Sequence, residues 1–182
     1  MLPTGLFHRA RRPDRGQSLV EFALVAPIFF LLIFSVVQFG LILAAQNGLV
    51  DGVRSAARRA ATYRINELSF DPTVFPSICT TIDDELHNRL SDSLIGYAAN
   101  RVASQITYEW ESNPESGEYF LVAHVHAAFD NVLYVPLVGW FLDSTDGNPD
   151  GVLTLFADER MRVENPALEF SSAPSPATQP CP

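Results

Sequence analysis

The feature that most constrains this chain is an uncharged run of 24 residues near its N-terminus. Residues 22–45 read FALVAPIFFLLIFSVVQFGLILAA and contain no Asp, Glu, Lys or Arg. A helix of that length spans roughly 36 Å, and the hydrocarbon core of a bilayer is about 30 Å thick. The apolar core of a cleaved secretory signal is shorter, at about 7 to 15 residues. The run therefore predicts a transmembrane helix over about residues 22–45.

The N-terminal border of this run carries a distinctive arrangement of charge. Four arginines precede Gly16, and one acid, Glu21, lies at the edge of the apolar run. A carboxylate inside a membrane helix is unfavourable by about 2.5 to 3.5 kcal/mol at the centre, so it usually has a partner. If the chain were cut after Gly16, Gln17 would carry a new α-amino group one helical turn from Glu21. The carboxylate could then neutralise that amine, in its own chain or in a neighbouring one.

These residues resemble a known family. A basic leader, Gly16, Glu21 five residues later, Phe22 and an apolar helix are similar to the class III signal of type IV pilins and pseudopilins. More narrowly, GQSLVEFALVAP, QFG and NGLVDGVRSAARRAA resemble the TadE-like pseudopilins of tight-adherence (Flp) pilus systems. The resemblance covers about residues 15–61. It implies that a prepilin peptidase removes residues 1–16 at the cytoplasmic face, between Gly16 and Gln17, and that other pilins and pilus assembly proteins are partners.

Three residues inside the run are candidates for helix packing. Pro27 removes one backbone hydrogen bond and loosens the helix, although prolines are also ordinary in membrane helices. Gly40 is small enough to allow close approach of another helix. Gln38 is the side chain best suited to an interhelical hydrogen bond.

The distribution of charge indicates which side of the membrane the rest of the chain occupies. The net charge is -9, but residues 1–64 carry +5 and residues 65–182 carry -14, with no lysine anywhere. Arginines before the helix favour a cytoplasmic N-terminus, while four arginines over residues 54–64 weaken that inference. We predict a single-pass protein of a prokaryotic inner membrane with an acidic extracytoplasmic head. Such a head would be repelled by phosphates, which argues against nucleic acid as a partner.

The remaining sequence predicts an α+β head with a second helix and a small antiparallel sheet. The long helix covers residues 17–64 and the head residues 65–165, with a loop over residues 66–82 and a second helix over residues 82–104. That helix would begin with the acidic triplet at residues 83–85, where negative charge suits the helix dipole. Alternating apolar residues predict strands around residues 106–110, 119–129 and 152–163. The Pro- and Ser-rich residues 166–182 predict a disordered tail.

Two small constellations have the residue types for chemistry. His124 and His126 share one face of a strand and could bind a metal, but no third ligand is evident, so a structural pair is favoured. Asp146, Asn148 and Asp150 match the first half of a calcium loop. Its twelfth position is Ala157, where Glu is expected, and Asp, Asn and Gly also simply form turns.

The two cysteines, Cys79 and Cys181, could form a disulfide outside the cytoplasm. No nucleophile–base pair or phosphate-binding loop is present in the sequence, so we expect neither an enzyme nor a cofactor. The pattern favours a pseudopilin that acts through helix packing. The alternative is an unprocessed, membrane-anchored binding module whose acidic head captures a ligand or calcium.

Overall fold

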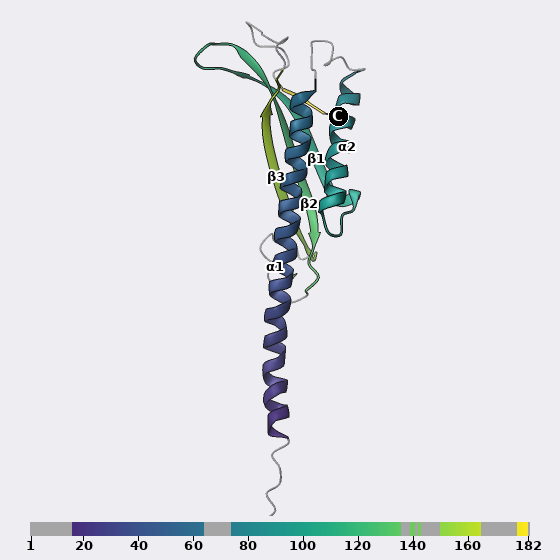
Figure 1. Ribbon diagram of the computed structural model, residues 1–182, viewed down its shortest axis with the longest axis vertical. Helices are drawn as coiled ribbons and strands as arrows, with labels where there is room; N and C mark the ends of the chain where they lie inside the picture. The colour runs from purple at the N-terminus through teal and green to yellow at the C-terminus, as the bar shows by residue number, and fades with distance from the viewer. Residues whose placement is uncertain are drawn as a thin grey trace, which may run out of the picture.

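The protein consists of one very long helix with a small α+β head docked along its second half (Figure 1). The computed structural model describes residues 16–63, 74–135, 139–140, 142, 150–164 and 178–181. The elements are α1 (Gln17–Thr62), α2 (Phe75–Ser93), the 3-10 turn η2 (Ala99–Arg101), β1 (Val102–Ser112), β2 (Tyr119–Val132), β3 (Val152–Arg162) and β4 (Thr178–Pro180). The predicted α+β class, with a long N-terminal apolar helix and a second helix beside an antiparallel sheet, is confirmed.

The four strands form one antiparallel sheet in the order β3-β2-β1-β4. One face of the sheet packs on the two helices, and none of the described helices covers the other face. Along β2 the residues alternate, so that Ala123 and Val125 are buried while His124 and His126 point outward. The hydroxyl of buried Tyr108 on β1 donates a hydrogen bond to the Ala60 carbonyl oxygen at 3.3 Å, which ties the sheet to α1. Burial raises the pKa of the Tyr108 phenol.

The second half of α1 carries small residues where α2 approaches. Gly52 lies against Leu90, and Gly48 lies against Ser93. A Cβ at Gly48 would be 3.1 Å from three Ser93 atoms, one of them the backbone oxygen. The alanine positions of the same stripe are also buried (Ala45, Ala56, Ala57, Ala60, Ala61). Small side chains therefore allow α2 to pack close to α1, as they do between membrane helices.

The predicted boundaries of α2 are wrong at both ends. The helix begins at Phe75, within the predicted loop, because Pro76 occupies the first turn, where a missing N–H has no consequence. It ends at Ser93, eleven residues before the predicted end, and Gly96 then adopts a positive φ of 75°. The acidic triplet consequently lies inside the helix and does not cap it. Leu86 and Leu90 are buried within α2, and Leu94 is buried just after its end.

The three predicted strands are present, with β1 and β2 longer than expected. The prediction of a disordered tail is wrong for Thr178–Pro180, which pair with Thr107–Glu109 of β1. The backbone N–H of the next residue, Cys181, donates to the Ile106 carbonyl oxygen at 2.8 Å. Residues 165–177 of the predicted tail and head boundary lie outside the described residues.

Candidate functional site: the apolar helix and its N-terminal border

The border residues predicted for processing lie at the exposed start of α1. Gly16 immediately precedes the helix, and Gln17, Glu21 and Phe22 occupy its first two turns, all of them exposed. The Gln17 side-chain amide donates a hydrogen bond to Glu21 Oε1 at 3.0 Å. Residue 17 and the carboxylate are therefore within direct reach of each other on one face of the helix. The basic leader, residues 1–15, lies outside the described residues.

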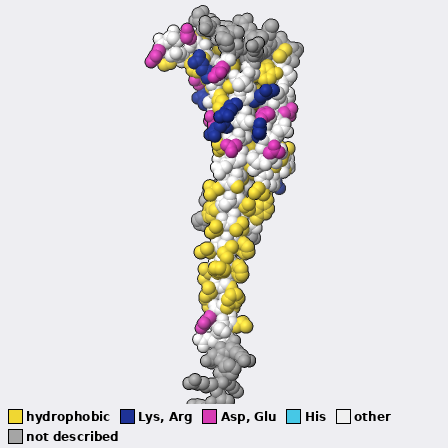
Figure 2. All heavy atoms as spheres, viewed as in Figure 1, with side chains coloured by type: hydrophobic (Ala, Val, Ile, Leu, Met, Phe, Trp, Pro, Cys, Tyr) yellow, Lys and Arg dark blue, Asp and Glu magenta, His cyan; other side chains and the backbone are white. Residues whose placement is uncertain are grey.

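The first half of α1 presents apolar side chains on every side. Figure 2 shows hydrophobic side chains over this part of the helix, while most charged side chains in view gather on the head. Leu19, Phe22, Ile28 and Val36 are each more than 60% exposed. The helix is long and apolar enough to cross a membrane, and among the described residues it is the only one that is. This suggests a single-pass membrane protein.

The three predicted packing residues have different surroundings. Pro27 is exposed within α1, and Gly40 is exposed with no atom within 4 Å of a Cβ built on it. Both remain available to a neighbouring helix. Gln38 is instead fully buried within its own chain, where its Oε1 accepts hydrogen bonds from the backbone N–H groups of Tyr134 and Val135 at 2.9 and 3.3 Å. Its Oε1 is therefore committed to the segment after β2.

This role of Gln38 was not predictable from the sequence, because its partners lie 96 and 97 residues further along the chain. The signal available in the sequence was a single glutamine inside the apolar run. Gln38 lies where the head begins to cover one side of α1.

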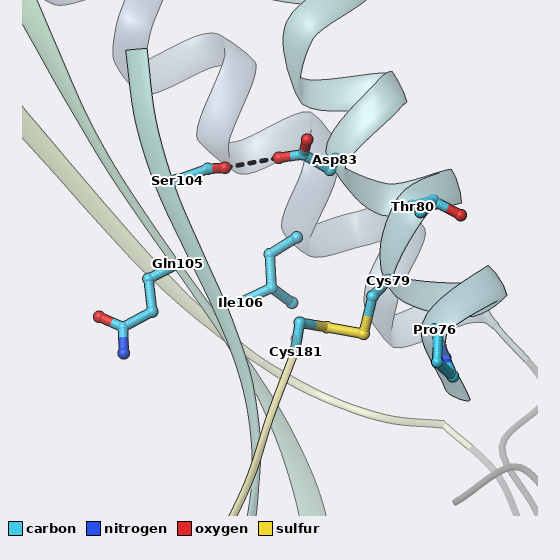
Figure 3. A pocket seen from close by; sticks show the side chains of 8 residues that line it. All are labelled: Pro76, Cys79, Thr80, Asp83, Ser104, Gln105, Ile106 and Cys181. Carbon is cyan, nitrogen blue, oxygen red and sulfur yellow. Dashed lines mark hydrogen bonds between the residues drawn. A yellow bond between two sulfur atoms is a disulfide. The ribbon is translucent and has the colours of Figure 1, made fainter. Parts of the chain in front are cut away.

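The cysteines that were expected to pair are joined by a disulfide, with Cα atoms 5.6 Å apart (Figure 3). The bond links α2 to the residue after β4. Beside it is a small pocket where the Ser104 hydroxyl donates to Asp83 Oδ1 at 2.5 Å. The pocket is lined by Pro76, Cys79, Thr80, Asp83, Ser104, Gln105, Ile106 and Cys181. The polar groups of this pocket serve to link α2 to β1, so we assign it no ligand.

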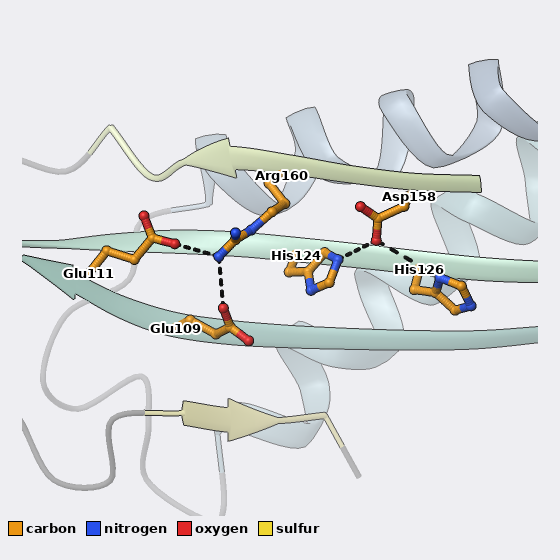
Figure 4. A network of polar contacts seen from close by, with 6 residues as sticks. All are labelled: Glu109, Glu111, His124, His126, Asp158 and Arg160. Atoms are coloured by element: carbon orange, nitrogen blue, oxygen red, sulfur yellow. Dashed lines mark hydrogen bonds and ion pairs between the residues drawn. The ribbon is translucent and has the colours of Figure 1, made fainter. Parts of the chain in front are cut away.

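The outward face of the sheet carries a network of ion pairs (Figure 4). Asp158 on β3 contacts His124 Nε2 directly and lies 3.9 Å from His126 Nδ1. Arg160 pairs with Glu109 at 2.9 Å and also with Glu111. No group of three potential ligands with metal-binding geometry occurs among the described residues. The two histidines of β2 thus lie beside one carboxylate of the neighbouring strand.

The candidate calcium loop is described only at its end. Asp146 and Asn148 lie outside the described residues, while Asp150 is exposed and its Oδ1 accepts the Val152 N–H at 3.0 Å. That bond is an ordinary turn contact. Ala157, at the twelfth position of the pattern, lies within β3 and pairs with Ala127.

Charge around the helical part of the head is locally paired. Glu85 on α2 accepts hydrogen bonds from Arg89 at 2.9 Å and from the Ser55 hydroxyl on α1 at 3.3 Å. The bond from Arg89, above all, lowers the pKa of Glu85. Arg54 lies 3.9 Å from Asp51 and 3.8 Å from Glu159. Of these ion pairs, only Arg54–Glu159 joins a helix to the sheet, since the other two lie within α1 and within α2.

Comparison with known proteins adds one match. No curated protein and no solved structure matches the chain. Residues 16–58 match the family described as "TadE-like protein". The match begins at Gly16 and runs through the bare half of α1 into the half that docks on the head. Over these residues the chain is similar to TadE-like proteins, which agrees with the resemblance found in its sequence.

Proposed function

We propose that this chain is a bitopic pseudopilin-like component of a tight-adherence pilus assembly or secretion system. The observation that carries the proposal is that the TadE-like match begins at Gly16, the residue immediately before α1, and continues through the half of α1 whose apolar side chains are exposed. The partners would be a prepilin peptidase, other pilins or pseudopilins, pilus assembly proteins and membrane lipid. No nucleic acid, cofactor or catalysis is part of the proposal. The N-terminus would face the cytoplasm of a prokaryote and the head would be extracytoplasmic.

The proposed processing step is hydrolysis of the peptide bond between Gly16 and Gln17. Cleavage removes the basic leader and leaves an α-amino group on Gln17. The contact of 3.0 Å between the Gln17 side chain and Glu21 supports the next step, because it places residue 17 one turn from the carboxylate. The positive amine and the negative carboxylate then neutralise each other, which lowers the free energy of placing both at a membrane border.

The proposed mode of action is packing of the bare part of α1 against the same part of other subunits. Exposed Pro27 and Gly40 support this, since both stand on the uncovered surface of the helix. Gln38 is withdrawn from that role by its bonds to the head. Without strong interhelical polar bonds, packing would depend on van der Waals contact and on close approach at small residues.

Intact-mass measurement of the membrane-extracted protein tests the processing step. We expect the mass of the chain lacking residues 1–16 when a cognate prepilin peptidase is present, and the full mass when it is absent. Gly16→Val should retain the leader, because it changes the residue at the cleaved bond, while Gly40→Val is the matched control and should be cut normally. A full-length chain in the presence of an active peptidase would contradict the proposal and favour the anchored binding module.

A second measurement addresses assembly separately from cleavage. Glu21→Gln keeps the shape of the side chain and removes its charge. We expect this variant to be cut normally but to copurify less with other pilus subunits, because the new amine of Gln17 has no counter-charge. Equal copurification of Glu21→Gln and the unchanged chain would refute the role of the carboxylate.

A further inference from the structure

Two segments of the head meet beside α1 where the helix becomes bare. We call them the base: Leu94–Gly96 after α2, together with Leu133–Val135, Gly139 and Trp140 after β2. The Tyr134 and Val135 N–H groups bond to Gln38, which fixes the second segment to α1. A Cβ built on Gly96 would lie 3.1 Å from the Tyr134 hydroxyl oxygen, so the two segments are in contact.

The base exposes large apolar side chains and has no charge. Ile95, Tyr134 and Trp140 are 59%, 58% and 72% exposed. Residues 93–100 and 131–142 contain no Asp, Glu, Lys or Arg, although the chain after residue 64 is strongly acidic. Exposed apolar surface gathered in one place marks a contact with a membrane or another protein.

The position of the base along α1 indicates that the contact is with lipid. The bare stretch Leu19–Val37 spans about 28 Å as a helix, close to the roughly 30 Å hydrocarbon core. If this stretch fills the core, Gln38 and the base lie at the boundary between hydrocarbon and headgroups. Phe39 and Leu43 are also exposed, at 49% and 64%, so one side of α1 stays apolar and uncovered beside the base.

The chemistry of the exposed residues agrees with that level. Tryptophan and tyrosine are enriched where a membrane meets water, because each joins an apolar ring to one polar group. A span over residues 22–45 would instead place Gln38 about 10 Å inside the hydrocarbon and draw the base in with it. The boundary near Gln38 avoids burying that part of the head in lipid.

We propose that the base is a membrane-contacting foot, in which Trp140 and Tyr134 lie among the lipid headgroups of the leaflet on the side of the head. The foot sets the depth of α1 and the height of the head above the bilayer. This inference depends on α1 spanning the membrane, as does the proposed function, but it depends neither on cleavage after Gly16 nor on pilus assembly.

Depth-dependent quenching of tryptophan fluorescence tests the foot. The full chain is reconstituted into phosphatidylcholine vesicles whose acyl chains carry bromine either near the headgroups or deep in the core. The chain has two tryptophans, so Trp110→Phe leaves Trp140 as the only reporter. We expect strong quenching of Trp140, greater with shallow bromines than with deep ones. Unmodified lipid provides the unquenched reference.

The matched control is Trp140→Phe, which leaves Trp110 on β1. Trp110 is about 26 Å along β1 from Val102, the first residue of the strand, which directly follows η2. We expect bromine at either depth to leave its fluorescence unchanged. If Trp110→Phe prevents folding, the unchanged chain serves as the second measurement, since the fraction of its emission that is quenched should disappear in Trp140→Phe.

Three results would overturn the foot. Absence of bromine quenching with ready quenching by aqueous acrylamide would place Trp140 in water. Protection from both quenchers would place it against protein, such as a second copy of this chain. Stronger quenching by deep bromines would place Trp140 in the hydrocarbon core, so the boundary would not lie at Gln38. Flotation of the protein with the vesicles reports insertion of α1 independently, so failure of the foot is distinguishable from failure of the anchor.

Discussion

Packing of α1 against α2 at Gly52 should reverse the usual effect of replacing a helical glycine by alanine. The change normally favours an exposed helix by about 1 kcal/mol. Here the new Cβ would lie 2.6 Å from Leu90 Cδ2 and 3.2 Å from Leu90 Cγ, whereas relaxed carbon contacts are about 3.5 to 4.0 Å. Leu90 is fully buried, so it cannot move aside into solvent. Overpacking of this kind costs about 1 to 3 kcal/mol.

The two terms predict a small net loss for Gly52→Ala alone, about 0 to 2 kcal/mol in the free energy of unfolding. The sharper quantity is the coupling between Gly52 and Leu90. Leu90→Ala removes the obstructing atoms and itself costs about 2 to 5 kcal/mol. In that background Gly52→Ala should become stabilising by about 1 kcal/mol or more. The coupling energy should therefore be about 1 to 3 kcal/mol in favour of the double variant.

Reversible denaturation of the full chain in a mild detergent, followed by near-ultraviolet circular dichroism, measures all four members of the cycle. Gly40→Ala is the control in both backgrounds, because no atom lies within 4 Å of its Cβ. Its coupling to Leu90→Ala should be zero. A coupling between Gly52 and Leu90 below about 0.5 kcal/mol, the usual limit of additivity, would refute close packing at this crossing.

Three further predictions concern the head. Replacing Cys79 and Cys181 together by serine should lower the free energy of unfolding by about 2 to 4 kcal/mol, because the bond closes a long loop; equal melting temperatures for the oxidised chain and the variant would contradict this. Glu85→Gln should lower the free energy of unfolding by at most about 0.5 kcal/mol at neutral pH. Because Arg89 lowers the pKa of Glu85 in the fold, the stabilisation by this carboxylate is present above the unfolded pKa and should be lost as pH falls through the folded pKa. A stability difference between the variant and the unchanged chain that persists at low pH would show another cause. We expect no rise in melting temperature when calcium is added, because Ala157 occupies the position of the final ligand, and a clear rise would instead support the binding-module alternative.

The extent of α1 followed from local properties. The uncharged run is visible in the sequence without knowledge of any distant partner, and the predicted end near residue 64 differs from Thr62 by only two positions. The alternation of β2 was equally local, since every second residue faces the helices.

Features that depend on distant partners were not predictable in the same way. Pro76 looked like part of a loop, yet proline at the start of a helix is compatible with it, and only the docking of Phe75 and Ile78 into the core distinguishes the two cases. Composition favoured disorder for residues 166–182, whereas Thr178–Pro180 pair with β1 beside a disulfide. The role of Gln38 required knowing which backbone would meet it.

The disulfide also sets an order of events in biosynthesis. A ribosome delivers Cys79 102 residues before Cys181, so the rest of α2 and β1 to β3 are all synthesised while the first thiol has no native partner. The edge of β1 at Thr107–Glu109 stays open for the same interval, and open edges invite pairing with foreign strands. Maturation of this head is therefore a late event, and a nascent chain stalled before residue 178 presents both a reactive sulfur and an unsealed strand.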